Sequence, residues 1–291
     1  MKKKKTFFDY ILYVFMGILA LITIAPFYNV LILSVADTVH YAKHIPYVLP
    51  HTVNFAGFKE IIEDPYFLKS MGVTLFITVV GTALNMLFSV SAAYVLSREK
   101  FLGRKFFLRF IIFTMLFSGG MVPTYLLVTE LNLLNTVWSM IFPCMINTYY
   151  VIIMKNYFQT LPESFQEAAI IDVANDLQVL LKIYLPISKP FLATFTLFYA
   201  VERWNEWWHS YLYVIDKNLK PLQIYLKEIF AVYNNQLAPQ LQQQLIQRQS
   251  QVFPQSVQMA TIVITMVPIM CVYPFIQKHF VKGITSGGTK E

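Results

Sequence analysis

Residues 160–190 read TLPESFQEAAIIDVANDLQVLLKIYLPISKP, a polar stretch that lies between two strongly apolar blocks of the chain. Thr160 and Glu163 have the spacing of a capping box. Pro162 would occupy the first turn of the capped helix, where a missing backbone N–H does no harm. We therefore expect a short helix that begins at Thr160 and weakens near Val173.

A second short helix is predicted within the same stretch. Asn175 and Gln178 repeat the capping pattern, and Pro186 predicts the end of the second helix. In the first helix, Ala168 and Ala169 leave a face small enough for another helix to approach closely. The stretch is therefore predicted to form two short helices between apolar segments.

The composition indicates an integral membrane protein. Of the 291 residues, 56% are hydrophobic and only 13% are charged, with a mean hydropathy of +0.52. Soluble proteins carry roughly 25% charged residues. The net charge is +7, and the basic residues cluster in short loops beside apolar runs. This distribution therefore indicates membrane topology, and no nucleic-acid partner is expected.

Six apolar segments predict six membrane crossings, because about 20 apolar residues span a hydrocarbon core of roughly 30 Å. The first follows a basic lead and is too long for a cleaved signal peptide. The fifth is short and needs its aromatic tail to cross. The segments are residues 10–35, 71–96, 106–128, 136–158, 187–201 and 259–276.

The distribution of lysine and arginine over the loops predicts the orientation. Fourteen of them flank one side of the predicted crossings, and seven lie in the longer loops of the other side. The cytoplasmic loops of membrane proteins carry an excess of lysine and arginine. Both termini and residues 160–190 are therefore expected to be cytoplasmic, a placement that does not depend on any motif.

The cysteines and the loop histidines show no metal-ligand spacing, so no metal site is expected. Cys144 and Cys271 each lie inside an apolar run, and we interpret both as small core residues. His40, His44 and His51 fall in a mixed polar stretch and are interpreted as parts of a solvated loop.

The stretch at 160–190 resembles the cytoplasmic coupling loop of ABC importer permeases, the EAA loop. The family pattern is Glu-Ala-Ala, three residues, Gly, nine residues, Ile or Val, one residue, and Leu-Pro. Six of its seven positions match here: Glu167, Ala168, Ala169, Ile183, Leu185 and Pro186. Val173 stands at the glycine position. A β-branched residue is poorly suited to positive φ, so the turn there is either built differently or strained.

The resemblance implies an all-α membrane fold of the type I ABC importer permease class, with six transmembrane helices and a helical coupling loop. Residues 1–291 would form one permease domain with a core at about 71–283, a coupling loop at 160–190 and an outer loop at 205–256. A short helix parallel to the membrane would dock in a groove of a cytoplasmic ATPase. The expected coupling residues are Glu163, Glu167, Ala168, Ala169, Asp172, Val173, Ala174, Ile183, Leu185 and Pro186.

No glycine is followed by lysine, so the chain has no phosphate-binding loop of its own. ATP and Mg²⁺ would be bound by the partner ATPase, and no cofactor is expected in this chain. Catalytic residues are not expected either. The chain is predicted to be a transport subunit and not an enzyme.

Other stretches resemble the carbohydrate-importer permeases, and more narrowly the branch grouped with polysaccharide or complex-oligosaccharide uptake. These are residues 117–125, 132–136 and 273–283. The resemblance implies a bacterial cytoplasmic membrane protein that pairs with a second, homologous permease as a heterodimer. Its further partners would be an ATPase dimer, an extracytoplasmic solute-binding protein, membrane lipid and the sugar.

Candidate pathway residues lie in two places: Gly119, Gly120, Pro123, Tyr125, Asn205, Glu206 and Trp207. The first group also fits a simple helix kink, and the second fits an aromatic belt at the membrane interface. Glu202 and Arg203 could partly neutralise each other, and they should face protein or water because a charge in lipid is costly. The glutamine-rich residues 221–256 fit either a solvated loop or a docking surface for a solute-binding protein.

The predicted function is inward movement of a sugar by alternating access, driven by ATP hydrolysis in the partner. A secondary transporter is one alternative, but the acidic residues fall at segment ends and not deep within the segments. A polytopic membrane enzyme is another, and neither a His-Glu-x-x-His nor a Gly-x-Ser-x-Gly motif occurs. An interfacial amphipathic helix would explain the polarity of residues 160–190 but not their spacing.

Overall fold

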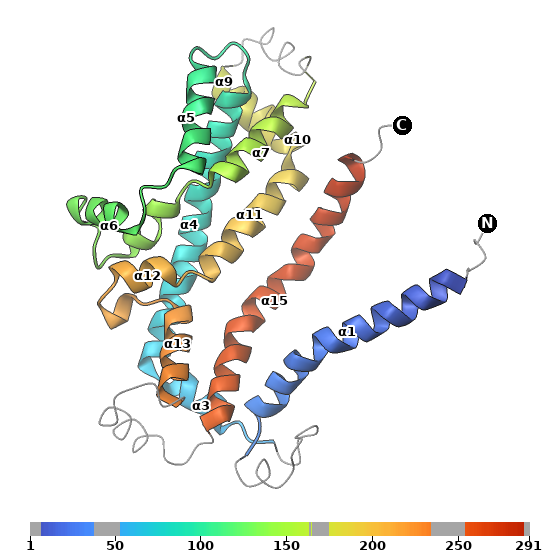
Figure 1. The fold of residues 1–291 in the computed structure, drawn as a ribbon, viewed down its shortest axis with the longest axis vertical. Helices are drawn as coiled ribbons and strands as arrows, with labels where there is room; N and C mark the ends of the chain where they lie inside the picture. The colour runs from blue at the N-terminus through green and yellow to red at the C-terminus, as the bar shows by residue number, and fades with distance from the viewer. Residues whose placement is uncertain (1–6, 38–52, 163, 165–174, 234–253, 288–291) are drawn as a thin grey trace. The chain divides into compact units, whose positions relative to one another are not determined.

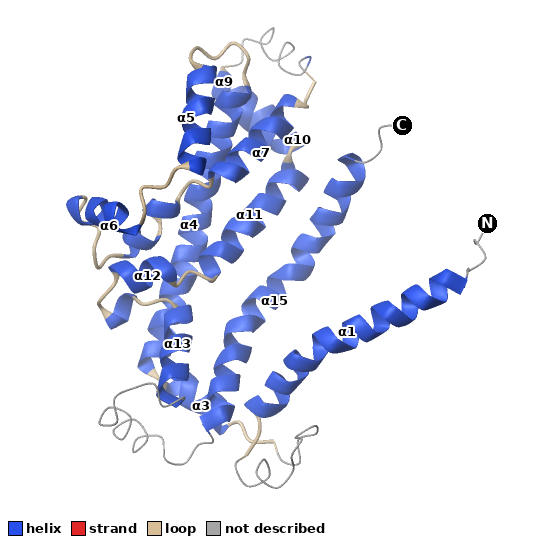
Figure 2. Ribbon diagram, viewed as in Figure 1, coloured by secondary structure: helices blue, strands red, loops and turns tan. Residues whose placement is uncertain are grey.

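The computed structural model describes residues 7–37, 53–162, 164, 175–233 and 254–287 (Figure 1). All regular elements in these ranges are helical, as the composition and the resemblance predict (Figure 2). The chain forms two compact units. One comprises residues 1–68 with 225–268, and the other comprises residues 69–224 with 269–291.

The first unit contains α1 (Phe7–Ser34) and the first part of α15 (Pro254–Gly287). α1 is strongly apolar after Asp9 in its first turn, and nearly all its side chains are exposed in the isolated chain. Only its last turn and the residues after it are buried: Ile32, Leu33 and Ala36 pack against Met259 of α15.

A close backbone approach also joins α3 (Ala56–Glu63) to α15 within this unit. A Cβ atom at Gly57 would lie 3.0 Å from the carbonyl carbon of Ser256. Backbone yields less readily than a flexible side chain, so any larger residue at position 57 would force a shift of Ser256. The aromatic ring of Tyr225 packs on Phe67, and its hydroxyl donates a hydrogen bond of 2.8 Å to Asp64.

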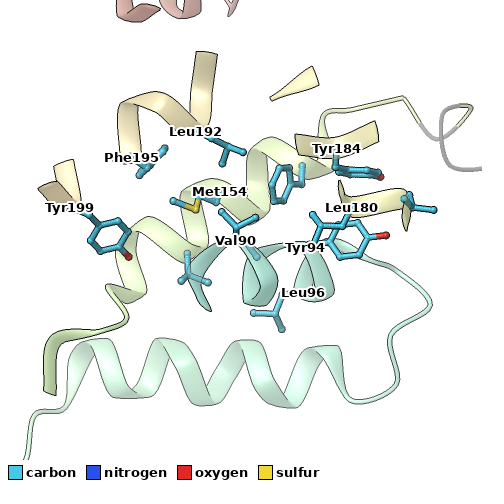
Figure 3. Packing of buried hydrophobic residues seen from close by; sticks show 13 residues of the cluster. Val90, Tyr94, Leu96, Met154, Leu180, Tyr184, Leu192, Phe195 and Tyr199 are labelled. Atoms are coloured by element: carbon cyan, nitrogen blue, oxygen red, sulfur yellow. The ribbon is translucent and has the colours of Figure 1, made fainter. Parts of the chain in front are cut away.

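The second unit is built around α4 (Pro65–Ser97), α7 (Thr148–Gln159) and α11 (Lys189–Trp204), which lie side by side in Figure 1. Their apolar faces and the segment that precedes α11 enclose one core (Figure 3). Its buried members are Val90, Ala93, Tyr94, Leu96, Val151, Met154, Phe158, Val179, Leu180, Tyr184, Leu192, Phe195 and Tyr199.

Shorter helices complete the described chain. They are α5 (Arg104–Leu116), α6 (Met121–Glu130), η1 (Val137–Met140), η2 (Phe142–Cys144), α9 (Asp176–Val179), the π-helical turn η3 (Leu180–Tyr184), α10 (Leu185–Ile187), α12 (Trp208–Tyr213), η4 (Lys217–Leu219) and α13 (Leu222–Tyr233).

Within the described ranges, three helices are long and apolar enough to cross a membrane: α1, α4 and the part of α15 at Pro254–Cys271. Two bent pairs raise the number to five if each pair is one span. α5 and α6 meet at 116°, and Val137–Cys144 meets α7 at 50°. α11, where the fifth crossing is predicted, has only 16 residues. The count of six crossings therefore stays a prediction.

Two expected helix boundaries in the coupling stretch are wrong. Thr160 directly follows α7 as its C-cap residue and has helical backbone angles, and its hydroxyl donates to the carbonyl of Tyr157 at 2.7 Å. It does not cap a new helix. Pro186 lies inside α10, and the helical path breaks two residues later at Ser188. The wider turn of η3 precedes Pro186, where Leu185 donates to the carbonyl of Leu180, five residues back.

Two other expectations are corrected. Residues 222–233 form α13, with Leu222, Ile224 and Ile229 buried, so the predicted polar outer loop is helical over this part. The glutamine-rich remainder, residues 234–253, lies outside the described residues. Cys271 is exposed on α15, so it is not a core residue, and Cys144 is half-buried beside polar groups.

Candidate coupling and translocation sites

The structure describes two parts of the coupling stretch: a few residues at its start (160–162 and 164) and residues 175–190. Three of the expected coupling residues, Ile183, Leu185 and Pro186, lie in η3 and α10. The other seven lie outside the described residues: Glu163, Glu167, Ala168, Ala169, Asp172, Val173 and Ala174.

The second helix of the stretch starts as predicted. The side-chain oxygen of Asn175 accepts the backbone N–H of Gln178 at 2.8 Å. In return, the side-chain oxygen of Gln178 accepts the backbone N–H of Asn175 at 3.0 Å. This reciprocal capping box satisfies two donors that the first turn leaves without helical partners.

Tyr184 anchors this helix in the core of the second unit. Its ring meets Tyr94 of α4 edge-on at 5.1 Å and Phe158 of α7 at 5.7 Å, and Figure 3 shows the three helical segments around it. Ile183 and Leu185 are half-buried against the same core. Edge-to-face aromatic pairs add about 0.5 to 1.5 kcal/mol to simple burial. The end of the coupling stretch is therefore packed onto two long helices.

An ion pair makes a second attachment to α4. Arg98, just after the last turn of α4, donates from Nη2 to the carboxylate of Asp176 at 3.0 Å, and its guanidinium lies 5.2 Å from the ring centre of Tyr94. The arginine is largely buried and the aspartate is largely exposed. The pair connects the first residue of α9 to the end of α4. Sequence reasoning missed it because 78 residues separate its members.

The first group of pathway residues lies where α5 gives way to α6. Gly120 has φ of +87°, a conformation that favours glycine, and the helical path bends there by 116°. The expected kink is therefore confirmed, and it is sharper than a simple bend. Pro123 lies in the first turn of α6, 3.7 Å from where a Cβ at Gly119 would be. The ring of Tyr125 is 5.9 Å from that of Tyr213.

The second group of pathway residues falls into three environments. Asn205 ends α11 and is exposed, and its amide donates to the carbonyl of Val201 at 2.9 Å. Trp207 is exposed, with its ring edge-on to Trp208 at 5.5 Å. Glu206, in contrast, is buried with 8% of its surface exposed. Its carboxylate is hydrogen-bonded to His209, so it does not share the exposed environment of Asn205 and Trp207.

Arg203 has a far larger role than neutralising Glu202. Arg203 is only 3% exposed. Its guanidinium donates to the side-chain oxygen of Asn85 at 2.9 Å, to three backbone carbonyl groups and to one sulfur atom. The remaining acceptors are Met140 O, Ile141 O, Cys144 O and Cys144 Sγ, at 2.6 to 3.5 Å. A charge inside an apolar segment was the signal in the sequence, and it faces protein as expected.

Gly81 makes room for this arginine. A Cβ at position 81 would lie 3.0 Å from Cδ of Arg203. The stem of Arg203 therefore passes directly over the backbone of α4 on its way to η1 and η2. Arg203 thus connects α11 to three other elements of the second unit.

A polar cluster of Cys144, Glu206 and His209 lies next to Arg203. Glu206 accepts the backbone N–H of His209 at 2.8 Å and holds Nδ1 of its ring at 2.9 Å. The sulfur of Cys144 is 3.7 Å from the same Nδ1. Burial alone would lower the pKa of His209, but the contacts with Cys144 and Glu206 raise it to about 10.

A second set of polar groups on α4, α7 and α11 was also missed. The hydroxyl of Tyr150 donates to Glu202 at 2.6 Å. The hydroxyl of Tyr199 is 2.7 Å from that of Ser89 and accepts the backbone N–H of Asn147 at 3.2 Å. Tyr199 and Ser89 are fully buried, so their hydrogen bond connects α11 to α4 inside the core. The signal in the sequence was the presence of polar residues at intervals in otherwise apolar runs.

Comparison with known proteins assigns the chain to a family. The family model described as "Binding-protein-dependent transport system inner membrane component" matches residues 85–286, which is most of the chain. The protein LplC of Bacillus subtilis is 42% identical over 284 residues, or 97% of this chain and 95% of that protein. The polygalacturonan/rhamnogalacturonan transport system permease protein YtcP, also of Bacillus subtilis, is 40% identical over 99% of both chains.

A solved structure agrees with these relatives. The crystal structure of a bacterial ABC transporter involved in the import of the acidic polysaccharide alginate contains a chain with a TM-score of 0.86. That chain is 32% identical to this one, and the match covers 96% of this chain and all of the other. The all-helical fold is thus the type I importer permease fold expected from the coupling motif. The chain belongs to the family of inner membrane components of binding-protein-dependent transport systems.

Proposed function

We propose that this chain is the permease subunit of an ATP-driven importer of oligosaccharides or polysaccharide fragments. The observation that carries the proposal is end-to-end identity of 40% with a permease for polygalacturonan and rhamnogalacturonan. The alginate importer chain supports it with a TM-score of 0.86 over nearly the whole chain. Fragments of these polymers are therefore the first substrates to test.

The coupling stretch is proposed to transmit force from a cytoplasmic ATPase. In this proposal Glu167 pairs with a basic residue of the ATPase groove, and Ala168 and Ala169 allow close packing of the docked helix. Two attachments support the role of the rest of the stretch as a lever. They are the buried ring of Tyr184 and the ion pair of Asp176 with Arg98, which connect it to α4 and α7. A rigid-body movement of the ATPase would then move these helices.

The full assembly is proposed to contain a second homologous permease, an ATPase dimer and an extracytoplasmic solute-binding protein. Six crossings, with both termini and the coupling stretch on the cytoplasmic side, complete the proposal. The unequal lysine and arginine content of the loops supports this orientation. The exposed apolar surface of α1 is suited to lipid or to the second permease.

The translocation pathway is proposed to run past the break at Gly119 and Gly120 and past the end of α11. The exposed side chains of Tyr125, Asn205 and Trp207 supply aromatic faces and an amide, the groups that commonly bind sugars. Glu206 would act indirectly, because its carboxylate is bonded to His209.

Uptake per ATP hydrolysed, measured in proteoliposomes that contain the whole complex, tests this function. Glu167→Lys is expected to keep ATP hydrolysis and to lose most uptake. Lys182→Glu is the matched control, since it reverses a charge at an exposed position of the same stretch that lies outside the family pattern. Equal uptake per ATP in Glu167→Lys and the unaltered protein would contradict the coupling role.

A further inference from the structure

Cys144, Glu206 and His209 bring three metal-ligating atoms together in the second unit, away from the coupling stretch. Sγ of Cys144, the carboxylate of Glu206 and a ring nitrogen of His209 all lie within 4.8 Å of one another. From this geometry we propose that the cluster binds one transition-metal ion of the zinc class. The ligands would be the Cys144 sulfur, a Glu206 oxygen and His209 Nδ1, and water would complete the coordination.

The distances fit a tetrahedral ion. Bonds of about 2.0 to 2.3 Å hold the ligand atoms of such an ion roughly 3.3 to 3.8 Å apart. Nδ1 of His209 is 3.7 Å from Sγ of Cys144, which is within this range. It is 2.9 Å from the Glu206 oxygen, the length of a hydrogen bond. An ion would replace the proton between these two atoms, and a shift of a few tenths of an ångström would admit it.

Two of the three ligands are held in place by hydrogen bonds. Glu206 is fixed by the backbone N–H of His209. The Cys144 sulfur accepts a hydrogen bond of 2.8 Å from Arg203, whose guanidinium also binds the carbonyl of Cys144 at 2.6 Å. The thiolate is the form of cysteine that binds metals, so the thiol proton would leave as the ion enters. In metal sites generally, hydrogen bonds from neighbouring groups to the ligand side chains hold those ligands in orientation.

The ligand types select the ion. Metal ions bind the deprotonated thiol and the neutral imidazole, so the cluster would release protons as the ion enters. Sulfur and imidazole ligands favour zinc and its chemical relatives over Mg²⁺ and Ca²⁺, which prefer oxygen. The bound ion would connect η2 directly to α12 and so stiffen the corner where α11 ends. This inference does not depend on the proposed transport function.

Cobalt titration tests the proposal, because Co²⁺ enters zinc sites and its thiolate complexes absorb in the near ultraviolet. The full-length chain, purified with a tag that lacks histidine and stripped with a chelator, would be titrated with Co²⁺. We expect about one equivalent of a thiolate-bound tetrahedral spectrum, which Zn²⁺ then displaces. Cys144→Ser should abolish the near-ultraviolet band. Cys271→Ser, which removes the exposed thiol of α15, should leave the band unchanged.

Two further variants keep the test informative if Cys144→Ser misfolds. His209→Ala and Glu206→Gln should each weaken Co²⁺ binding at least tenfold while the Cys144 thiol is retained. Zn²⁺ should raise the thermal unfolding midpoint of the unaltered chain but not that of these variants. The proposal is overturned if no thiolate band appears, or if the band persists in Cys144→Ser. Binding in the variants that equals binding in the unaltered chain would also overturn it, and the cluster would then be a hydrogen-bonded network only.

Discussion

Replacing Arg203 by methionine should destabilise the second unit strongly. Methionine retains much of the apolar stem that passes over Gly81, but it removes every donor of the guanidinium. The acceptors left behind are the Asn85 side chain and the carbonyls of Met140 and Cys144, which Arg203 reaches at 2.9, 2.8 and 2.6 Å. All lie in a part of the protein where Arg203 itself is only 3% exposed.

The expected loss follows from these bonds. A hydrogen bond to a charged group contributes about 1.5 to 3 kcal/mol, so the bonds to these three oxygen atoms together amount to roughly 5 to 9 kcal/mol. Removing a charge from a buried place recovers several kcal/mol of desolvation cost. The net loss in the free energy of unfolding should therefore be about 3 kcal/mol. Arg203→Lys should fall between methionine and arginine, because one ammonium group cannot reach all of these acceptors.

Unfolding by sodium dodecyl sulfate from mixed micelles, followed by circular dichroism, measures this difference. Lys189→Met is the matched control, since it removes an exposed cation at the other end of the same helix and should change stability little. The reasoning is refuted if Arg203→Met lies within about 0.5 kcal/mol of the unaltered protein, the range of ordinary surface substitutions. It is also refuted if Arg203→Met and Lys189→Met are equally stable.

Three other changes have definite expected results. Gly57→Ala should cost about 1 to 3 kcal/mol in the same unfolding assay, because the new Cβ would meet backbone atoms at 3.0 Å. Gly72→Ala is the control: position 72 lies within α4, and a Cβ there would have no neighbouring atom within 4 Å. This change should be neutral or stabilise the protein by up to about 1 kcal/mol. Arg98→Gln should change stability by no more than about 1 kcal/mol, since Asp176 is 80% exposed, yet it should lower uptake per ATP hydrolysed; unchanged uptake would remove the pair from the coupling path. Val173→Gly should still assemble with the ATPase in a pull-down assay, and loss of assembly would show that the coupling turn departs from the family form.

Much of the fold could be predicted from local patterns. The long apolar runs predicted α1, α4 and α15, because a run of 20 apolar residues has few other stable states. The spacing of Asn175 and Gln178 predicted a capping box that the structure contains. These features depend on residues that are close together in the sequence. The family followed from the coupling pattern for the same reason.

Most of the features that were missed depend on residues far apart in the chain. The partners of Arg203 lie 59 to 118 residues away, so the sequence showed a costly charge but not the carbonyl groups that bind it. Pro186 was predicted to end a helix because proline usually does, and the π-helical turn before it could not be foreseen. Cys144 and His209 gave no metal signal because their spacing of 65 residues matches no short motif.

The identity of the proteins that copurify with this chain tests the central claim most directly. The tagged chain would be purified in mild detergent from the cell that produces it, and its companions identified by mass spectrometry. An unrelated membrane protein with the same tag would serve as the control. We predict a second permease of the same family and an ATPase, both absent from the control. Recovery of the chain without any ATPase, from membranes in which it supports uptake, would contradict the account.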